Sequence, residues 1–349
     1  MSTASGIVRV LVIDDSAYVR KVVAQMLSRS PFLEVVATAR DGREALELVE
    51  EHRPDVITCD LNMPDMNGIT FIREQMARRS IPILVMSIAS GSGEQVLAAL
   101  EAGAVDFVQK PTALASERLL EVADELIQKV KAAAGAAVHR TLVPTHEPMT
   151  VVPRTPAAAP TGVDIVVLGI STGGPQGLKL VIPRLPEDFP VPVAIVLHMP
   201  VGYTELYARK LDEISLLRVA EAREGDTIMA GRVYLAPAGR HLSFRRVDGQ
   251  VRAHLDLRPL DTPHRPSVDV LFQSAAEVYG GRTMAIVMTG MGADGREGAA
   301  WIKARGGRVL TEAEESCVVY GMPRSVAEAG LSDASVHIER MAAAILERI

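Results

Sequence analysis

The chain has 349 residues, more than one typical core holds and enough for two domains of roughly 100 to 200 residues each. Hydrophobic residues make up 48% and charged residues 23%, which excludes disorder for the bulk of the chain, and the net charge of -6 argues against a nucleic-acid partner. Only two cysteines occur and no export signal or membrane-length apolar run is visible, so we expect a soluble cytoplasmic protein without direct membrane insertion.

The first part of the chain, from Val8 to about Ala134, alternates short apolar runs with stretches of helical periodicity. A last helix begins at about Ser116. Five strands alternating with five helices are typical of βαβ units. This predicts an α/β domain with a five-stranded parallel sheet of the flavodoxin-like kind. The expected strands are RVLVID at 9–14, LEVVATA at 33–39, DVITC at 55–59, PILVMS at 82–87 and DFV at 106–108.

A change of composition divides the chain. Between Ala132 and Thr161 proline recurs and no periodicity is sustained, which is typical of a linker that is extended where proline dominates. We therefore predict a first domain at 6–134, an Ala/Pro-rich linker at 135–162 and a second domain at 163–349.

The second domain returns to the alternating pattern. Its clearest strands are DIVVLGI at 164–170, VPVAIVL at 191–197 and TMAIVM at 283–288, each followed by a helical stretch. The segments RVYLAPAGRHLSF at 232–244 and QVRAHLDL at 250–257 are rich in strand-forming residues. The pattern predicts a doubly wound α/β domain with a β-hairpin insertion.

In a parallel sheet, functional residues usually lie at the carboxyl ends of the strands. Acidic side chains stand at this edge in the first domain. Asp14 and Asp15 follow the first strand, and Asp60 follows the third. Three carboxylates at one edge repel one another unless a divalent cation joins them, and hard oxygen ligands suit Mg²⁺. Lys110, after the fifth strand, supplies a positive charge for a phosphoryl group that Asp60 attacks. The sequence therefore predicts an acyl phosphate on Asp60 that requires Mg²⁺.

These residues lie in the motifs VIDDS, TCDLNMPDMNG, VMS and FVQKP, and the segment resembles the receiver domains of response regulators. The resemblance covers roughly Val8 to Ala134 and implies phosphotransfer from a histidine kinase. It also implies that Asn62 offers its backbone carbonyl to the metal, that Ser87 is the switch hydroxyl and that Phe107 is the switch aromatic residue.

A serine stands at a glycine-rich turn directly after the first strand of the second domain. Gly169, Ser171 and Gly173 satisfy the spacing G-x-S-x-G, in which small neighbours permit a sharp turn that exposes the hydroxyl. Pro175 suits the first turn of a following helix, whose N-terminus favours an oxyanion near Ser171. We therefore expect the Thr172 amide to be an oxyanion donor. Taken alone, such a turn also fits phosphate binding.

A base and an acid follow two other strands of the second domain. His198 comes directly after VPVAIVL, and Asp294 lies in the glycine-rich turn TGMGADG after TMAIVM. Because the carboxyl ends of parallel strands meet at one edge, a nucleophile, a base and an orienting acid can converge there. The chain order Ser, His, Asp differs from the Ser, Asp, His order of most α/β-hydrolases.

The motifs GISTGGP, LHMP, VYLAPAGRHL, HRPSVDVLF, TGMGADG and GMPRSV make roughly 164–349 resemble the catalytic domain of the CheB family of chemotaxis methylesterases. The resemblance implies Ser171 as the nucleophile, His198 as general base and acid, and Asp294 as the partner of His198. It further implies the Met291 backbone amide as an oxyanion donor.

The activity implied is attack by Ser171 on a glutamate γ-methyl ester of a methyl-accepting chemoreceptor, which gives an acyl-enzyme and methanol. Water activated by His198 then hydrolyses the acyl-enzyme, and no cofactor is required for this step. By the same resemblance, the site is expected to deamidate receptor glutamines as well. The resulting role is adaptation in a two-component chemosensory pathway.

The fusion of a receiver to a hydrolase predicts that the receiver restrains the esterase until Asp60 is phosphorylated, with an activation of about 5- to 150-fold. Two other interpretations stay open at this point. One is a phosphorylation-responsive interaction module without turnover, and the other is a DNA-binding response regulator, although no helix-turn-helix pattern is evident. His264 and Arg265 fit either a guide for an acidic substrate or a solvated surface pair.

Overall fold

The chain forms two compact units, Met1–Val143 and Pro144–Ile349. The predicted linker at 135–162 falls almost entirely outside the described residues. Within the described part of the chain, no helix has both the length and the apolar character that crossing a membrane requires. The computed structural model describes residues 6–87, 93–110, 116–135 and 162–349, and the side chains of all these except 116–119 and 121.

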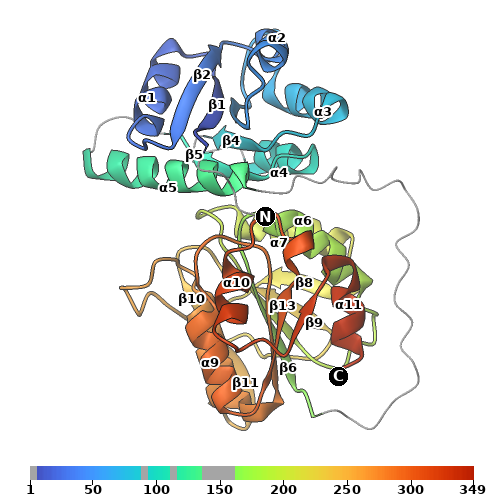
Figure 1. Ribbon diagram of the computed structural model, residues 1–349. Helices are drawn as coiled ribbons and strands as arrows, with labels where there is room; N and C mark the ends of the chain where they lie inside the picture. The colour runs from blue at the N-terminus through green and yellow to red at the C-terminus, as the bar shows by residue number, and fades with distance from the viewer. Residues whose placement is uncertain (1–5, 88–92, 111–115, 136–161) are drawn as a thin grey trace. The chain divides into compact units, whose positions relative to one another are not determined.

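A five-stranded parallel sheet forms the centre of the first unit (Figure 1). The strand order is β2-β1-β3-β4-β5, and each neighbouring pair is parallel. The order reverses between β1 and β3, so the residues after these two strands lie side by side. The strands are β1 (Val8–Ile13), β2 (Leu33–Ala39), β3 (Val56–Asp60), β4 (Ile83–Ser87) and β5 (Asp106–Gln109).

Helices cover both faces of this sheet. One face packs against α1 and α5, where Val23 and Leu126 join a core with Val10 and Leu84. On the other face, α3 contacts both α2 and α4. Polar side chains start three of the helices by accepting backbone N–H groups, as Asp41 does at α2. The helices are α1 (Ala17–Leu27), α2 (Gly42–His52), α3 (Gly68–Arg78), α4 (Gly93–Glu101) and α5 (Ser116–Ala134).

A seven-stranded parallel sheet forms the centre of the second unit, in the order β14-β13-β12-β6-β7-β9-β8. The order reverses at β6, which lies between β12 and β7. The three central strands consist entirely of buried residues, as expected for a sheet covered on both faces. The strands are β6 (Ile165–Ile170), β7 (Val193–Leu197), β8 (Arg218–Glu221), β9 (Arg232–Leu235), β12 (Thr283–Val287), β13 (Arg308–Glu312) and β14 (Ala334–Val336).

Two layers cover the second sheet. The antiparallel hairpin of β10 (His241–Val247) and β11 (Gln250–Asp256) shares one hydrophobic core with α8, α9 and α10. On the other side, α6 contacts both α7 and α11, and the Tyr207 hydroxyl of α7 donates to the Pro175 carbonyl at 2.7 Å. The remaining elements are α6 (Gly174–Val181), α7 (Thr204–Glu213), α8 (Val268–Tyr279), α9 (Arg296–Ala304), α10 (Met322–Glu328), α11 (Ile338–Leu346), η1 (Ile182–Arg184), η2 (Gly280–Arg282) and η3 (Glu314–Ser316).

The predicted fold class is confirmed in both units, including the β-hairpin insertion. One assignment within it was wrong. The segment 232–235, expected in the insertion, is strand β9 of the main sheet and pairs in parallel with both β7 and β8. Its side chains Val233, Tyr234 and Leu235 are all buried, which explains why this short strand joins the central layer.

Candidate functional site

The switch point of the second sheet brings three predicted catalytic residues to one edge. Ser171 follows β6 directly, His198 follows the neighbouring strand β7, and Asp294 lies in the turn between β12 and α9. The His198 amide donates to the Ile170 carbonyl at 3.1 Å, so the ends of β6 and β7 are joined. A hydroxyl, an imidazole and a carboxylate therefore share the location where doubly wound sheets bind their ligands.

The turn that carries Ser171 requires glycine at two close approaches. Gly173 has φ +79°, and a Cβ there would lie 2.6 Å from Val318 Cγ2. A Cβ on Gly290 would lie 2.7 Å from the Ser171 Cβ. The amide of Ser171 donates to the Thr289 carbonyl at 2.9 Å. The sharp turn is thus held against the loop after β12, and the serine side chain stays only partly buried.

His198 and Asp294 form a direct hydrogen bond, in which His198 Nε2 lies 2.9 Å from Asp294 Oδ2. Asp294 also accepts from the Ser267 hydroxyl at 2.9 Å, the Val268 amide at 2.8 Å and the Asp269 amide at 3.0 Å. An ionised carboxylate only accepts hydrogen bonds, so Nε2 carries the proton and Nδ1 is left as the basic nitrogen. Asp294 is therefore fixed from several directions and fixes the imidazole in turn.

His198 and the start of helix α8 determine the electrostatics of Asp294. Burial raises the pKa of Asp294, but the hydrogen bond and charge of His198 and the amides of Val268 and Asp269 outweigh it and hold the pKa below its ordinary value. Asp269 in turn accepts the amides of Gly295 and Gly298 at 2.9 and 2.7 Å, at the start of α9. Asp294 thus binds the first turn of α8, which contains Asp269, and Asp269 binds the first turn of α9, which follows Asp294. Helix N-termini favour negative charge.

The other nitrogen of His198, Nδ1, is buried and has no hydrogen-bond partner in the described residues. No hydrogen bond joins Ser171 and His198 within this same part of the chain. Catalytic hydrogen bonds are often made only once substrate is bound. Within the described residues, a free Nδ1 on His198 is therefore compatible with a base that accepts the Ser171 proton when substrate binds. His264 stacks on His198 with ring centroids 4.1 Å apart, which favours the interpretation of His264 as part of the site.

The predicted oxyanion donors belong to two loops that meet at the serine, since Thr172 follows Ser171 and Met291 follows Gly290. Thr172 is buried directly after Ser171, and its carbonyl accepts the Thr289 hydroxyl at 2.9 Å. Met291 lies in the loop after β12, next to Gly290. The Met291 amide donates no hydrogen bond to the described residues, whereas the Gly290 carbonyl accepts the amides of Gly321 and Met322. These positions favour the predicted oxyanion roles, which stay predictions.

Two residues near the serine were missed by the sequence reasoning. Thr289 binds both Ser171 and Thr172, and its own amide donates to Glu312 Oε2 at 2.9 Å. Glu312 is the last residue of β13 and is fully buried. The same rule that singled out the ends of the other strands would have found Glu312, had the strand RVLTE been recognised.

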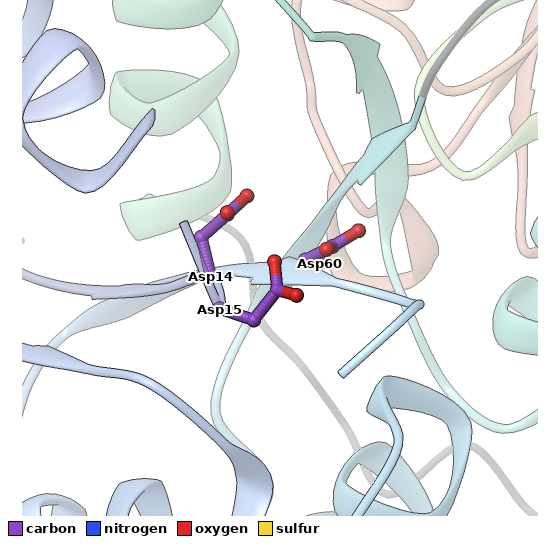
Figure 2. A group of neighbouring side chains, drawn as sticks. All are labelled: Asp14, Asp15 and Asp60. Carbon is purple, nitrogen blue, oxygen red and sulfur yellow. The ribbon is translucent and has the colours of Figure 1, made fainter. Parts of the chain in front are cut away.

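The carboxylates at the edge of the first sheet converge as predicted. Ligand oxygens of Asp14, Asp15 and Asp60 all lie within 4.8 Å of one another (Figure 2). Asp14 and Asp60 are buried, whereas Asp15 is exposed. Asp14 Oδ2 forms an ion pair with Lys110. Three hard oxygen donors suit Mg²⁺, so the residues fit the predicted metal.

Lys110 bridges the two buried acids of this cluster. Its Nζ lies 2.7 Å from Asp14 Oδ2 and 2.8 Å from Asp60 Oδ2. Burial lowers the pKa of Lys110, but hydrogen bonds to Asp14 and Asp60 outweigh it and raise the pKa above its ordinary value. Burial is also the largest cause of the raised pKa of Asp14. The lysine therefore stays charged and offsets part of the negative charge of the three acids.

The remaining predicted residues of the receiver lie at or near the ends of β3, β4 and β5. The Lys110 amide donates to the Ser87 carbonyl at 2.7 Å, which joins the ends of β4 and β5. Phe107 is buried, and the Lys129 ammonium lies 5.7 Å from its ring centroid and 2.8 Å from its carbonyl oxygen. Asn62 is exposed two residues after Asp60. Their switch and ligand roles stay predictions.

Comparisons with known proteins agree with both units. The family model for the CheB methylesterase matches residues 166–345, and the model for the response regulator receiver domain matches residues 10–124. A protein-glutamate methylesterase/protein-glutamine glutaminase of Myxococcus xanthus is 48% identical over 98% of both chains. A protein of the same name from Geobacillus kaustophilus is 43% identical over 98% of this chain and 99% of its own.

Solved structures support the same relationship. The crystal structure of the Thermotoga maritima CheB methylesterase catalytic domain is 42% identical, with a TM-score of 0.53, and the match covers 54% of this chain and 99% of that one. The fold and the two sites define the class of protein as a response-regulator receiver joined to an α/β hydrolase. Within that class, the chain belongs to the CheB methylesterase family.

Proposed function

We propose that the protein hydrolyses glutamate γ-methyl esters on chemoreceptors with Ser171, His198 and Asp294 as a catalytic triad. The observation that carries this proposal is the 2.9 Å hydrogen bond between His198 and Asp294 at the sheet edge where Ser171 emerges. Relatives that match the chain over nearly its full length are named protein-glutamate methylesterase/protein-glutamine glutaminase. Adaptation in a chemosensory pathway follows from that activity.

The first half of the reaction forms an acyl-enzyme. Asp294 keeps the proton of His198 on Nε2, so Nδ1 accepts the proton of the Ser171 hydroxyl as its oxygen attacks the ester carbonyl. The amides of Met291 and Thr172 stabilise the negative charge that develops on the carbonyl oxygen. The ester bond then breaks, and methoxide takes the proton from His198 to leave as methanol.

The second half regenerates the serine. Water gives a proton to His198 Nδ1 and attacks the acyl carbon, which releases the glutamate side chain as its acid and returns the proton to Ser171. A glutamine amide can follow the same route with ammonia as the leaving group. Deamidation is therefore the second activity that we propose for this site, and the relatives' names include glutaminase.

The first unit supplies the control. A histidine kinase donates the phosphoryl group to Asp60, and Lys110, 2.8 Å from that carboxylate, compensates the added charge. When bound, Mg²⁺ would be held by Asp14, Asp15, Asp60 and the Asn62 carbonyl and would neutralise charge on the phosphoryl oxygens. We propose that the receiver restrains the esterase until Asp60 is phosphorylated. Phosphorylation then changes the positions of Ser87 and Phe107, and this change ends the restraint.

Two measurements test the catalytic proposal on the full chain. A serine-directed phosphonate probe is expected to label the protein stoichiometrically, and methylated receptor is expected to release methanol. Ser171→Ala should abolish the labelling and lower methanol release by at least about three orders of magnitude. Ser335→Ala, an exposed serine of β14, is the matched control and should behave as the unchanged protein. Normal methanol release by Ser171→Ala would contradict the triad.

A further inference from the structure

Glu312 is a buried acid at the functional edge of the second sheet that the proposed mechanism does not use. It ends β13, the strand next to β12, and its exposed fraction is 0%. Within the described part of the chain, no lysine, arginine or histidine forms an ion pair with it. A carboxylate buried without a cation costs several kcal/mol unless its oxygens are hydrogen-bonded.

The hydrogen bonds of Glu312 lead directly to the serine turn. Its Oε2 accepts the Thr289 amide at 2.9 Å, and its Oε1 accepts the Ser316 hydroxyl at 3.0 Å. Burial raises the pKa of Glu312 to about 6, although these two hydrogen bonds oppose the shift. Both oxygens act as acceptors, which matches the ionised form. A fully buried acid whose hydrogen bond runs to the residue that holds the serine turn indicates a role beyond packing.

Thr289 connects Glu312 to the nucleophile through all of its polar groups. The Thr289 carbonyl accepts the Ser171 amide at 2.9 Å, and the Thr289 hydroxyl donates to the Thr172 carbonyl at 2.9 Å. The same hydroxyl accepts the Val319 amide at 2.9 Å. Thr289 also precedes Gly290 and Met291 in the chain. The position of Thr289 therefore determines where Ser171 lies and where the loop with the expected oxyanion donor, Met291, lies.

We infer that Glu312 is a positioning residue. Its carboxylate holds the Thr289 amide, and this keeps the Ser171 hydroxyl and the Met291 amide in the positions that attack on the ester carbonyl requires. The inference rests on the proposed function, because it assigns Glu312 a part in the chemistry of Ser171. The role needs an acceptor of the right reach at this location and does not need the charge. Glutamine can replace the glutamate, since its amide oxygen accepts from Thr289 and its NH₂ donates to the Ser316 hydroxyl.

Three variants of the full chain test this role by the rate of phosphonate labelling at Ser171 and by kcat and KM for methyl ester hydrolysis. Glu312→Ala is expected to lower the labelling rate and kcat about 10- to 100-fold, with KM nearly unchanged, because a misplaced nucleophile costs this much. Glu312→Gln should stay within about threefold of the unchanged protein. Glu315→Ala, an exposed neighbour in η3, is the matched control and should have no effect.

The outcomes separate this inference from the proposed function. If the unchanged protein is not labelled, the serine mechanism itself fails. If the unchanged protein is labelled and Glu312→Ala is labelled equally fast, the positioning role is wrong. An equal loss in Glu312→Gln and Glu312→Ala would also overturn it, because the acceptor would not restore function. Should Glu312→Ala not fold, Glu312→Asp replaces it, since one missing methylene removes the reach to Thr289 and should lower the labelling rate in the same way.

Discussion

The two units stabilise clustered acids at the switch points of parallel sheets in different ways. In the first unit a lysine side chain does so, with Lys110 Nζ 2.7 Å from Asp14 and 2.8 Å from Asp60. In the second unit backbone amides add to the hydrogen bond from His198, since Asp294 and Asp269 accept amides from the first turns of α8 and α9. The first unit uses the charge of a flexible lysine side chain, and the second uses the dipoles of backbone N–H groups that are fixed in helices.

This difference suits the chemistry that each acid is proposed to perform. A lysine can move from a carboxylate to a phosphoryl oxygen, so Asp60 remains able to react and to change its surroundings afterwards. Backbone amides at a helix start cannot move without unwinding the helix, so Asp294 can orient His198 but is unsuited to attack. A substitution at the acids of the first unit should therefore change phosphorylation and leave the reactivity of Ser171 unchanged. A substitution at the acids of the second unit should change ester hydrolysis and leave phosphorylation unchanged.

The largest expected effect is complete loss of phosphorylation in Asp60→Asn, because the amide nitrogen cannot replace the attacking oxygen. Incubation with a small-molecule phosphodonor and Mg²⁺ should give hydroxylamine-sensitive phosphate on the unchanged protein and none on this variant. Labelling of Ser171 by the phosphonate probe, without phosphodonor, should stay unchanged. Asp65→Asn, at an exposed position after β3, is the control that should retain phosphorylation. Phosphate on Asp60→Asn would refute the assignment.

The reciprocal change in the second unit is Asp294→Asn. The asparagine can still accept helix amides, but its NH₂ would face His198 and favour the tautomer with the proton on Nδ1. We expect kcat for ester hydrolysis to fall about 10²- to 10⁴-fold, with phosphorylation of Asp60 unaffected. Glu297→Gln removes an exposed acid from the first turn of the same helix and should leave kcat unchanged. A loss below tenfold in Asp294→Asn would remove Asp294 from the triad.

A smaller effect is expected for Asp15→Asn, which weakens one oxygen ligand of the predicted metal without touching the Lys110 ion pairs. The Mg²⁺ concentration for half-maximal phosphorylation should rise by at least about tenfold. Glu47→Gln, an exposed acid of α2, serves as the comparison and should keep the original Mg²⁺ dependence. An unchanged Mg²⁺ requirement in Asp15→Asn would exclude Asp15 as a ligand.

The smallest expected effect concerns stability and Asp269. Burial, together with the neighbouring Asp294, raises the pKa of Asp269 to about 6. A raised acid pKa means that folding favours the neutral form, so this contribution is present below the ordinary pKa near 4 and is lost as the pH rises through about 6. Asp269→Asn keeps a neutral acceptor for the α9 amides and should therefore be more stable than the unchanged protein at pH 8, by about 1 to 2 kcal/mol.

The fluorescence of the single tryptophan, Trp301, reports this change because it lies on α9. Urea unfolding at pH 8 and at pH 4 should show the stability gain of Asp269→Asn only at the higher pH. A gain of the same size at both values would mean that ionisation of Asp269 is not its cause. A loss at pH 8 would show that the carboxylate itself stabilises α9.

Most of the fold could be predicted from the sequence because the strands are continuous apolar runs. Every strand expected in the first unit is present, and so are those that lead to Ser171, His198 and the loop before Asp294. Two of the strands that escaped prediction are short and partly exposed, namely β8 at 218–221 and β14 at 334–336. Their side chains give no clear alternation, and only pairing with neighbours already in the sheet makes them strands.

The candidate site could be predicted only where a motif or a strand end carries a reactive side chain. Glu312 was missed because the strand RVLTE was not recognised, and a single acid outside a recognised strand looks like a turn residue until its burial is known. The role of Thr289 runs largely through main-chain groups, which a sequence does not specify. For His264 the sequence left open a guide for an acidic substrate and a surface pair with Arg265, because its stacking on His198 depends on a long-range approach that no local pattern encodes.

Control of hydrolysis at Ser171 by phosphorylation of Asp60 can be measured as methanol release from a methylated chemoreceptor. The full chain is assayed with and without a small-molecule phosphodonor in the presence of Mg²⁺, next to Asp60→Asn. We expect the phosphodonor to raise the rate about 5- to 150-fold in the unchanged protein and not at all in Asp60→Asn. An unchanged rate, or equal stimulation of Asp60→Asn, would contradict the account.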